Sequence, residues 1–190
     1  MKKRVALLVL TGSFLLASAA QAAPDRVGHL EVGVQGGYSM NDKIDDTGFV
    51  LANVDYGLTP YFAVGFEGGW EEADGDPDET VGIVHLMGDL IVRSPDFHEN
   101  FVPYGVLGLG VIGGYVTDTE GVEPNNSGAD SYESSFAWKL GVGVEYLLSP
   151  NWALNFEIAY YGTSVDLPNS TLGDDSLDHW KIGGGAKYIF

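Results

Sequence analysis

The stretch 136–146, FAWKLGVGVEY, alternates strictly between large apolar and small or charged residues, and it decides the fold. Apolar side chains occupy its even positions, and Lys139 and Glu145 stand on the odd positions between them. A period of two places successive side chains on opposite faces of a β-strand. The same alternation recurs at 152–160 and 180–190. The sequence therefore predicts β-strands that each have one apolar and one polar face.

Eight such segments follow one another, and no helical pattern separates them. They are expected at 28–38, 48–58, 61–71, 80–93, 101–116, 134–148, 151–164 and 179–190. This length suits tilted strands that cross a membrane, which need ~9–11 residues in its apolar zone. The connections alternate between short ones at 59–60, 94–100 and 149–151 and long ones at 39–47, 72–79, 117–133 and 165–178. We therefore expect an all-β fold, an eight-stranded antiparallel up-and-down transmembrane β-barrel.

Alternation alone does not tell which face of the barrel points outward. A soluble exported barrel would turn its apolar face inward, around a ligand. Aromatic residues near both ends of the apolar faces favour the membrane version, because such girdles mark the two interfaces of a bilayer. They are Tyr56, Phe62, Tyr146, Trp152 and Tyr188 toward the short turns, and Trp70, Phe136, Trp138, Tyr160 and Trp180 toward the long connections. The facing of 102–116, almost wholly apolar or glycine, stays open.

The N-terminus predicts export. Basic residues 2–4 precede a short apolar run, and Ala20-Gln21-Ala22 forms a small-x-small cleavage motif. We expect residues 1–22 to be a signal peptide, cleaved between Ala22 and Ala23, and residues 23–190 to form the barrel domain. The expected location is the outer membrane of a Gram-negative bacterium, with both termini in the periplasm and the long connections outside the cell.

The chain is strongly acidic, with 27 Asp and Glu against 9 Lys and Arg. Eighteen of the acids fall in or beside the long connections, Glu71 and Glu72 among them, so four acidic extracellular loops are expected. This charge argues against a nucleic-acid partner, and the lack of cysteine excludes disulfides and thiolate metal sites. No cofactor is expected. The carboxylates of 71–79 are either solvated or in weak contact with divalent cations, which lipopolysaccharide phosphates could share.

The polar face carries charges that a narrow lumen would have to bury. The expected lumen network is Glu31, Asp55, Glu67, Asp89, Lys139, Glu145, Glu157, Lys181 and Lys187. Six acids against three bases are unbalanced, and buried charges persist only when they are paired. His85, Arg93, water, a bound cation or protonated carboxyls must therefore complete the network. A structural ion network is the main interpretation, and a narrow ion or small-solute pore is the alternative.

Several motifs resemble the small eight-stranded outer-membrane β-barrel proteins, the OmpA/OmpX-like superfamily, across the whole mature chain. The segment 180–190 is similar to the family's C-terminal assembly signal, in which alternating hydrophobic residues end on Phe. The resemblance implies that the barrel-assembly machinery reads Tyr188 and Phe190. In addition, 54–67 recurs at 144–157 with seven of 14 positions identical, which predicts one hairpin used twice.

We interpret the chain as a non-enzymatic, monomeric protein with a structural or surface-interaction role, and we expect outer-membrane lipids and lipopolysaccharide as its partners. Some small barrels hydrolyse lipids, and the lipid A deacylases carry a His-x-Ser pair on a late strand. The corresponding strand here, 159–164, contains no His. His179 with Ser164 or Ser176 is the remaining candidate pair. We expect no enzymatic activity, and a lipid-modifying enzyme is the alternative.

Overall fold

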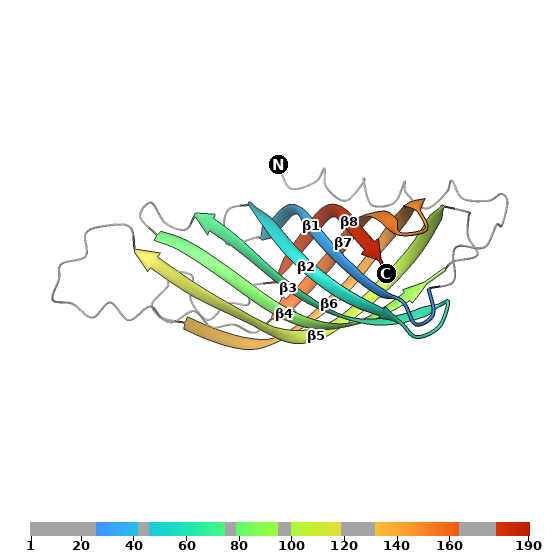
Figure 1. The fold of residues 1–190 in the computed structure, drawn as a ribbon. Helices are drawn as coiled ribbons and strands as arrows, with labels where there is room; N and C mark the ends of the chain where they lie inside the picture. Colours follow the sequence, from blue (N-terminus) through green and yellow to red (C-terminus); the bar gives the residue numbers. More distant parts are fainter. Residues whose placement is uncertain (1–25, 42–45, 75–78, 95–99, 119–131, 164–177) are drawn as a thin grey trace, which may run out of the picture.

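The computed structural model describes residues 26–41, 46–74, 79–94, 100–118, 132–163 and 178–190. Eight strands form one closed antiparallel barrel, in which neighbours in sequence pair and β1 closes onto β8 (Figure 1). The strands are β1 (Leu30–Asn41), β2 (Thr47–Gly57), β3 (Phe62–Asp74), β4 (Glu79–Arg93), β5 (Phe101–Asp118), β6 (Tyr132–Ser149), β7 (Trp152–Thr163) and β8 (His179–Ile189). The predicted eight-stranded barrel is confirmed. Among the described residues, no helix has the length and apolar character needed to cross a bilayer.

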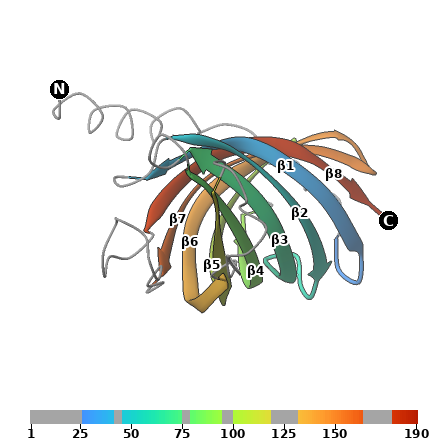
Figure 2. The same cartoon turned by 90° about the vertical axis from the view of Figure 1, so that its left-hand side faces the viewer.

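The facing of the side chains decides between the two kinds of barrel. Large apolar residues on every strand point outward and are exposed, such as Phe66 at 70% and Val142 at 65% of their surface. Charged residues point inward and are buried, such as Lys139 at 1% exposure. The strands curve around the interior of the barrel (Figure 2). An apolar outside and a charged inside are the arrangement of a membrane barrel, and the reverse of a soluble one.

The strand whose facing the sequence left open also has an ordered alternation. On β5, Leu107, Leu109 and Val111 are exposed on the outer face, whereas Val106 and Ile112 are buried inside. Apolar residues therefore occupy both faces of this strand. Among the described side chains of this strand, only the hydroxyl of Tyr104 is polar on the inner side, and for that reason the sequence pattern is ambiguous.

The two ends of the barrel differ. We call the end that holds the β2–β3 turn, the β6–β7 turn and the end of β8 the short-turn end, and the opposite one the loop end (Figure 1). At the loop end the sequence prediction needs correction. The pair Asp74↔Thr80 continues the β3–β4 ladder, so the connection expected at 72–79 shrinks to 75–78. Likewise 39–47 shrinks to 42–46, and the long connections are 119–131 and 164–178.

The repeated hairpin has the same turn chemistry in both copies. Thr59 Oγ1 accepts hydrogen bonds from the backbone N–H groups of Tyr61 (3.2 Å) and Phe62 (2.9 Å). Ser149 Oγ accepts from the N–H groups of Asn151 (3.3 Å) and Trp152 (3.1 Å). Each hydroxyl stands one residue before a proline, which supplies the fixed φ of a tight turn. The predicted double use of one hairpin is visible in these contacts.

Candidate functional site

The interior of the barrel holds nearly all of the described positive charge. The described residues bury seven carboxylates, five bases and two histidines there. The nine side chains that the sequence assigned to the lumen are all buried, namely Glu31, Asp55, Glu67, Asp89, Lys139, Glu145, Glu157, Lys181 and Lys187. They are joined by Arg26, Glu71, His85, Arg93 and His179. Because buried charges are stable only when paired, their contacts define the site.

At the short-turn end, two arginines neutralise two glutamates. Arg93 forms a bidentate pair with Glu31, with both N–O distances at 2.7 Å. Arg26 Nη1 lies 2.5 Å from Glu145 Oε2 and 3.4 Å from Glu31 Oε2. Arg26 precedes β1, and Gly28, with a φ of 77°, allows the turn after which the arginine reaches the interior. The first residue of the described chain therefore contributes its side chain to the interior at this end of the barrel.

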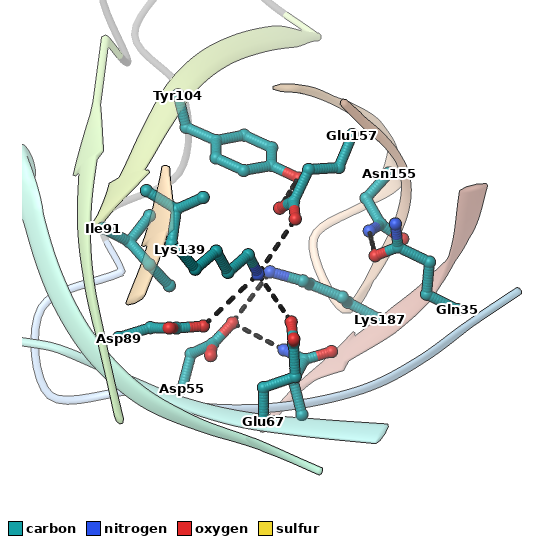
Figure 3. A pocket seen from close by; sticks show the side chains of 12 residues that line it. Gln35, Asp55, Glu67, Asp89, Ile91, Tyr104, Lys139, Asn155, Glu157 and Lys187 are labelled. Carbon is teal, nitrogen blue, oxygen red and sulfur yellow. Dashed lines mark hydrogen bonds and ion pairs between the residues drawn. The ribbon is translucent and has the colours of Figure 1, made fainter. Parts of the chain in front are cut away.

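The middle of the barrel is organised around Lys139. Its Nζ lies 2.6 Å from Glu67 Oε2, 2.9 Å from Glu157 Oε1 and 3.5 Å from Asp89 Oδ2. The carboxylates converge on the ammonium group from three different strands (Figure 3). One lysine thus compensates three carboxylates, and this layer has an excess of negative charge.

Two tyrosine hydroxyl groups and one histidine ring also contact the carboxylates of the middle layer. Tyr161 donates a hydrogen bond to Glu67 Oε1 at 2.6 Å, and Tyr104 donates one to Glu157 Oε2 at 2.9 Å. His85 Nε2 lies 3.2 Å from Glu67 Oε1. Hydrogen bonds to a charged acceptor are stronger than neutral ones, so these donors hold the carboxylates in fixed positions.

The two copies of the repeated hairpin supply equivalent pairs of carboxylates, and one lysine bridges each pair. Lys139 bridges the first pair, Glu67 and Glu157, in the middle layer. Lys187 bridges the second, because its Nζ lies 2.8 Å from Asp55 Oδ2 and 3.0 Å from Glu145 Oε1. The repeat therefore sets the charge pattern of the interior as well as the turns.

The loop end contains a third group of charges, and it corrects one sequence assignment. Glu71, expected among the loop acids, lies on β3 with its side chain 1% exposed. Its Oε1 lies 3.2 Å from Lys181 Nζ and 3.5 Å from His179 Nε2. The alternation of β3 explains this position, since Glu71 shares a face with Glu67.

His179 also bears on the enzyme alternative. Its ring stacks on Tyr161 with centroids 5.1 Å apart and an interplanar angle of 2°, and it is 2% exposed. The candidate partners Ser164 and Ser176 lie outside the described residues, as do Ala22 and Ala23 of the predicted cleavage site. Within the described chain, His179 belongs to the interior packing beside Glu71.

Side chains fill most of the interior. Four apolar residues pack together at the short-turn end beside the arginine pairs, namely Val102, Leu147, Ala153 and Ile189. A second apolar cluster consists of Ala63, Ile91, Tyr104 and Val106. Between the charged layers lies a polar cavity of about 20 Å³, which has room for about one water molecule. This part of the described interior is therefore packed around a cavity that holds about one molecule.

Glycines provide the space for this network. Gly108 stands between Asp89 and Lys139 in the sheet. A Cβ at Gly108 would collide with Asp89 Oδ1 and would lie 3.0 Å from Lys139 Cβ. Gly69 lies against the His85 ring in the same manner. Many of the 27 glycines of the chain are thus explained by crowding inside a narrow barrel.

Some members of the site escaped the sequence interpretation. Arg26 lies before the first strand, where no alternation assigns a face. Tyr104 and Tyr161 stand among apolar, aromatic and glycine residues in the sequence, and only their hydroxyl contacts in the structure reveal a polar role. Following the alternation to the last residue of the expected strand 61–71 would have placed Glu71 on the same face as Glu67.

Comparison with known proteins places this architecture in a family. The sequence matches the Outer membrane protein beta-barrel domain over residues 5–190. The chain belongs to this family. Membership supports the outer membrane of Gram-negative bacteria as its location, and it confirms the resemblance inferred from the sequence motifs. Comparison with curated protein sequences gave no significant match.

Solved structures of outer-membrane barrels share the fold of this family member. Neisserial surface protein A is 13% identical, with 85% of this chain and 96% of that chain covered and a TM-score of 0.66. OprG of Pseudomonas aeruginosa is 14% identical, covers 90% and 99%, and has a TM-score of 0.57. Ail, the attachment invasion locus protein of Yersinia pestis, is 16% identical, covers 86% and 99%, and has a TM-score of 0.51. At such identities the likeness concerns the fold alone.

The two residues of the expected assembly signal lie at the short-turn end. Phe190 is 62% exposed, and its ring meets that of Tyr188 edge-on with centroids 4.8 Å apart. Tyr188 also contacts Trp152 at 5.1 Å. The Phe190 N–H donates to Leu30 O at 2.9 Å, so the end of the chain is fixed against the start of β1.

Proposed function

We propose that this outer-membrane barrel is a non-enzymatic, closed scaffold that presents acidic connections at its loop end to the exterior of the cell. The observation that carries the proposal is the packed interior. Ion pairs and apolar side chains fill the described part of the lumen, and the cavity of about 20 Å³ is far smaller than a solute pathway. An eight-stranded barrel has an interior just wide enough for its side chains to fill.

The distribution of the bases supports a surface role for the acidic residues. Three of the nine Lys and Arg residues belong to the predicted signal peptide, and Lys43 lies outside the described residues. The remaining five are all buried in the interior. In the described chain, no lysine or arginine side chain is therefore left on the outside to neutralise rim acids such as the exposed Glu72. Such a surface attracts cationic partners, or lipopolysaccharide bridged by divalent cations.

The surface role can be separated from the scaffold by trimming the two long connections. A variant in which short turns replace 119–131 and 164–177 should refold with an unchanged Tm. On a gel, its unboiled sample should still migrate as the compact folded barrel and its boiled sample as the unfolded chain. In proteoliposomes it should bind a fluorescent oligolysine probe several-fold more weakly than the wild type at low salt. Equal binding of the probe by both proteins would contradict the display of acidic connections. As the electrostatic control, high salt should abolish probe binding by both proteins.

We also propose that the barrel-assembly machinery recognises the exposed aromatic end of β8. Substitution Phe190→Ala should lower the amount of folded barrel in the outer membrane several-fold, because it removes the exposed ring while leaving the lumen network intact. The measurement is the folded fraction in outer-membrane preparations on unboiled gels. Val54→Ala, on the outer face of β2, is the matched control and should assemble normally. If Phe190→Ala assembled at the wild-type level, the recognition proposal would fail.

A further inference from the structure

A chain of polar contacts joins the charges of the loop end to the middle layer, and His85 is its central member. His85 Nε2 lies 3.2 Å from Glu67 Oε1, and His85 Nδ1 lies 3.3 Å from Lys181 Nζ. Lys181 Nζ in turn lies 3.2 Å from Glu71 Oε1. Because β8 pairs with neither β3 nor β4, these contacts cross the interior of the barrel and tie its walls together.

The two contacts of the His85 ring determine which ring nitrogen carries a proton. Lys181, which forms an ion pair with Glu71, is an ammonium group that can only donate, so Nδ1 of His85 must accept. The Glu67 carboxylate can only accept, so Nε2 must donate to it. The contacts therefore describe a neutral ring that carries its proton on Nε2.

A second proton on this ring would have no acceptor. His85 is 2% exposed and Lys181 is 3% exposed, so water is excluded from the contact between them. The sheet partner of His85 on β5 is the apolar Ile112. The charged and titratable side chains that face His85 from the other strands are Glu67 and Glu71 of β3, Tyr161 of β7 and Lys181 of β8.

Both carboxylates near His85 already have cationic partners. Glu67 lies 2.6 Å from Lys139 Nζ and accepts a hydrogen bond from Tyr161, also at 2.6 Å. Glu71 is paired with Lys181. A charged His85 ring would therefore add a cation to a region whose carboxylates are already compensated.

We propose that His85 makes the loop end of this barrel sensitive to acid. A proton on Nδ1 would place two cations 3.3 Å apart in a low-dielectric interior, where like charges repel strongly. Lys181 must then move away from His85, and the link between the loop end and the middle layer breaks. At the short-turn end, Arg93 and Arg26 pair with glutamates and the described interior contains no buried histidine, so acid should loosen one end only.

The first test compares the Tm of the refolded full barrel with that of His85→Gln in neutral detergent. Glutamine can donate to Glu67 and accept from Lys181, but it cannot gain a proton. An unfolded chain binds the histidine proton below about pH 6.5 whereas the folded ring excludes it, so this contribution to stability is full above that pH and is lost below it. Between about pH 7.5 and about pH 5.5, the wild type should lose roughly 2–4 °C more of its Tm than the variant. Equal losses would overturn the proposal.

The matched control is a histidine outside the interior. His29 is exposed at the short-turn end, so His29→Gln should lose as much Tm in acid as the wild type. If His29→Gln removed the acid-dependent loss instead, the sensitivity would lie at the short-turn end and the proposal would be wrong.

Amide hydrogen exchange locates the effect within the barrel. At the same acidic pH, the loop-end amides of β3, β4 and β8 should exchange several-fold faster in the wild type than in His85→Gln. The amides at the short-turn end should exchange equally in both proteins. Equal exchange at the loop end would contradict the local loosening.

A measurement on the wild type alone is independent of whether His85→Gln refolds. Nitrogen NMR of the labelled histidine rings should show His85 neutral at neutral pH, with its proton on Nε2. The ring should stay neutral at an acidic pH at which the exposed His29 is already charged. A charged His85 ring in the folded barrel at neutral pH would overturn the proposal.

Discussion

Substitution Lys139→Met is expected to lower the free energy of unfolding of the barrel by about 3–5 kcal/mol, since removing one partner of a buried ion pair leaves an uncompensated charge. Lys139 is 1% exposed, and its ammonium group contacts Glu67, Glu157 and Asp89. Methionine preserves most of the side-chain length and packing. The loss therefore reports the electrostatic role of the ammonium group and not a cavity.

The measurement is equilibrium unfolding in urea, followed by tryptophan fluorescence in detergent or lipid vesicles. Glu72→Gln, at the exposed rim, is the control and should stay within about 0.5 kcal/mol of the wild type. Adding Glu67→Gln and Glu157→Gln to Lys139→Met should recover part of the stability, because these changes remove two of the charges left unpaired. A loss below about 1 kcal/mol for Lys139→Met would contradict the paired-charge description of the interior.

Substitution Leu140→Arg is expected to destabilise the membrane-inserted barrel by about 2–4 kcal/mol, the range for a cation on the lipid face at the bilayer midplane. Leu140 lies near the middle of β6, points outward and is 57% exposed. Its neighbour Lys139 carries the same sign of charge inward without such a penalty, because carboxylates surround it. The same strand thus offers one position that requires a cation and one that rejects it.

The control for Leu140→Arg lies on the same strand. Leu148 points outward at the short-turn end of β6 and is 56% exposed. Leu148→Arg should cost only about 0–1 kcal/mol, since charges near the membrane interface are tolerated. Unfolding in lipid vesicles measures both. If the two variants were equally stable, the outer face of β6 would not cross the bilayer as described.

Period-two alternation was sufficient to predict most of the fold from the sequence. On β6 and β8 it assigned Lys139, Lys181 and Lys187 to one face, and the closed barrel buries all three. The direction of that face did not follow from alternation itself. It followed from the aromatic residues near the strand ends, which prefer a membrane interface.

Other parts of the site depend on three-dimensional closure. Which carboxylates share Lys139 is set by the positions of β3, β4 and β7 around the barrel, and no local pattern encodes it. Arg26 lies outside the strands altogether. Glu71 was misassigned because an acidic run next to Gly and Pro is typical of a loop, whereas backbone pairing continued through Asp74. On β5 the described inner face is apolar apart from the hydroxyl of Tyr104, so composition carried little facing signal.

We propose that ion pairs and apolar clusters close the interior of the barrel. Current recording across a planar lipid bilayer tests this claim most directly, with insertion verified by the unboiled-gel shift of the recovered protein. Verified insertions of the wild-type barrel should give no unitary currents at any applied voltage in monovalent salt. Reproducible unitary currents from the wild-type protein would contradict the closed interior and favour the narrow pore.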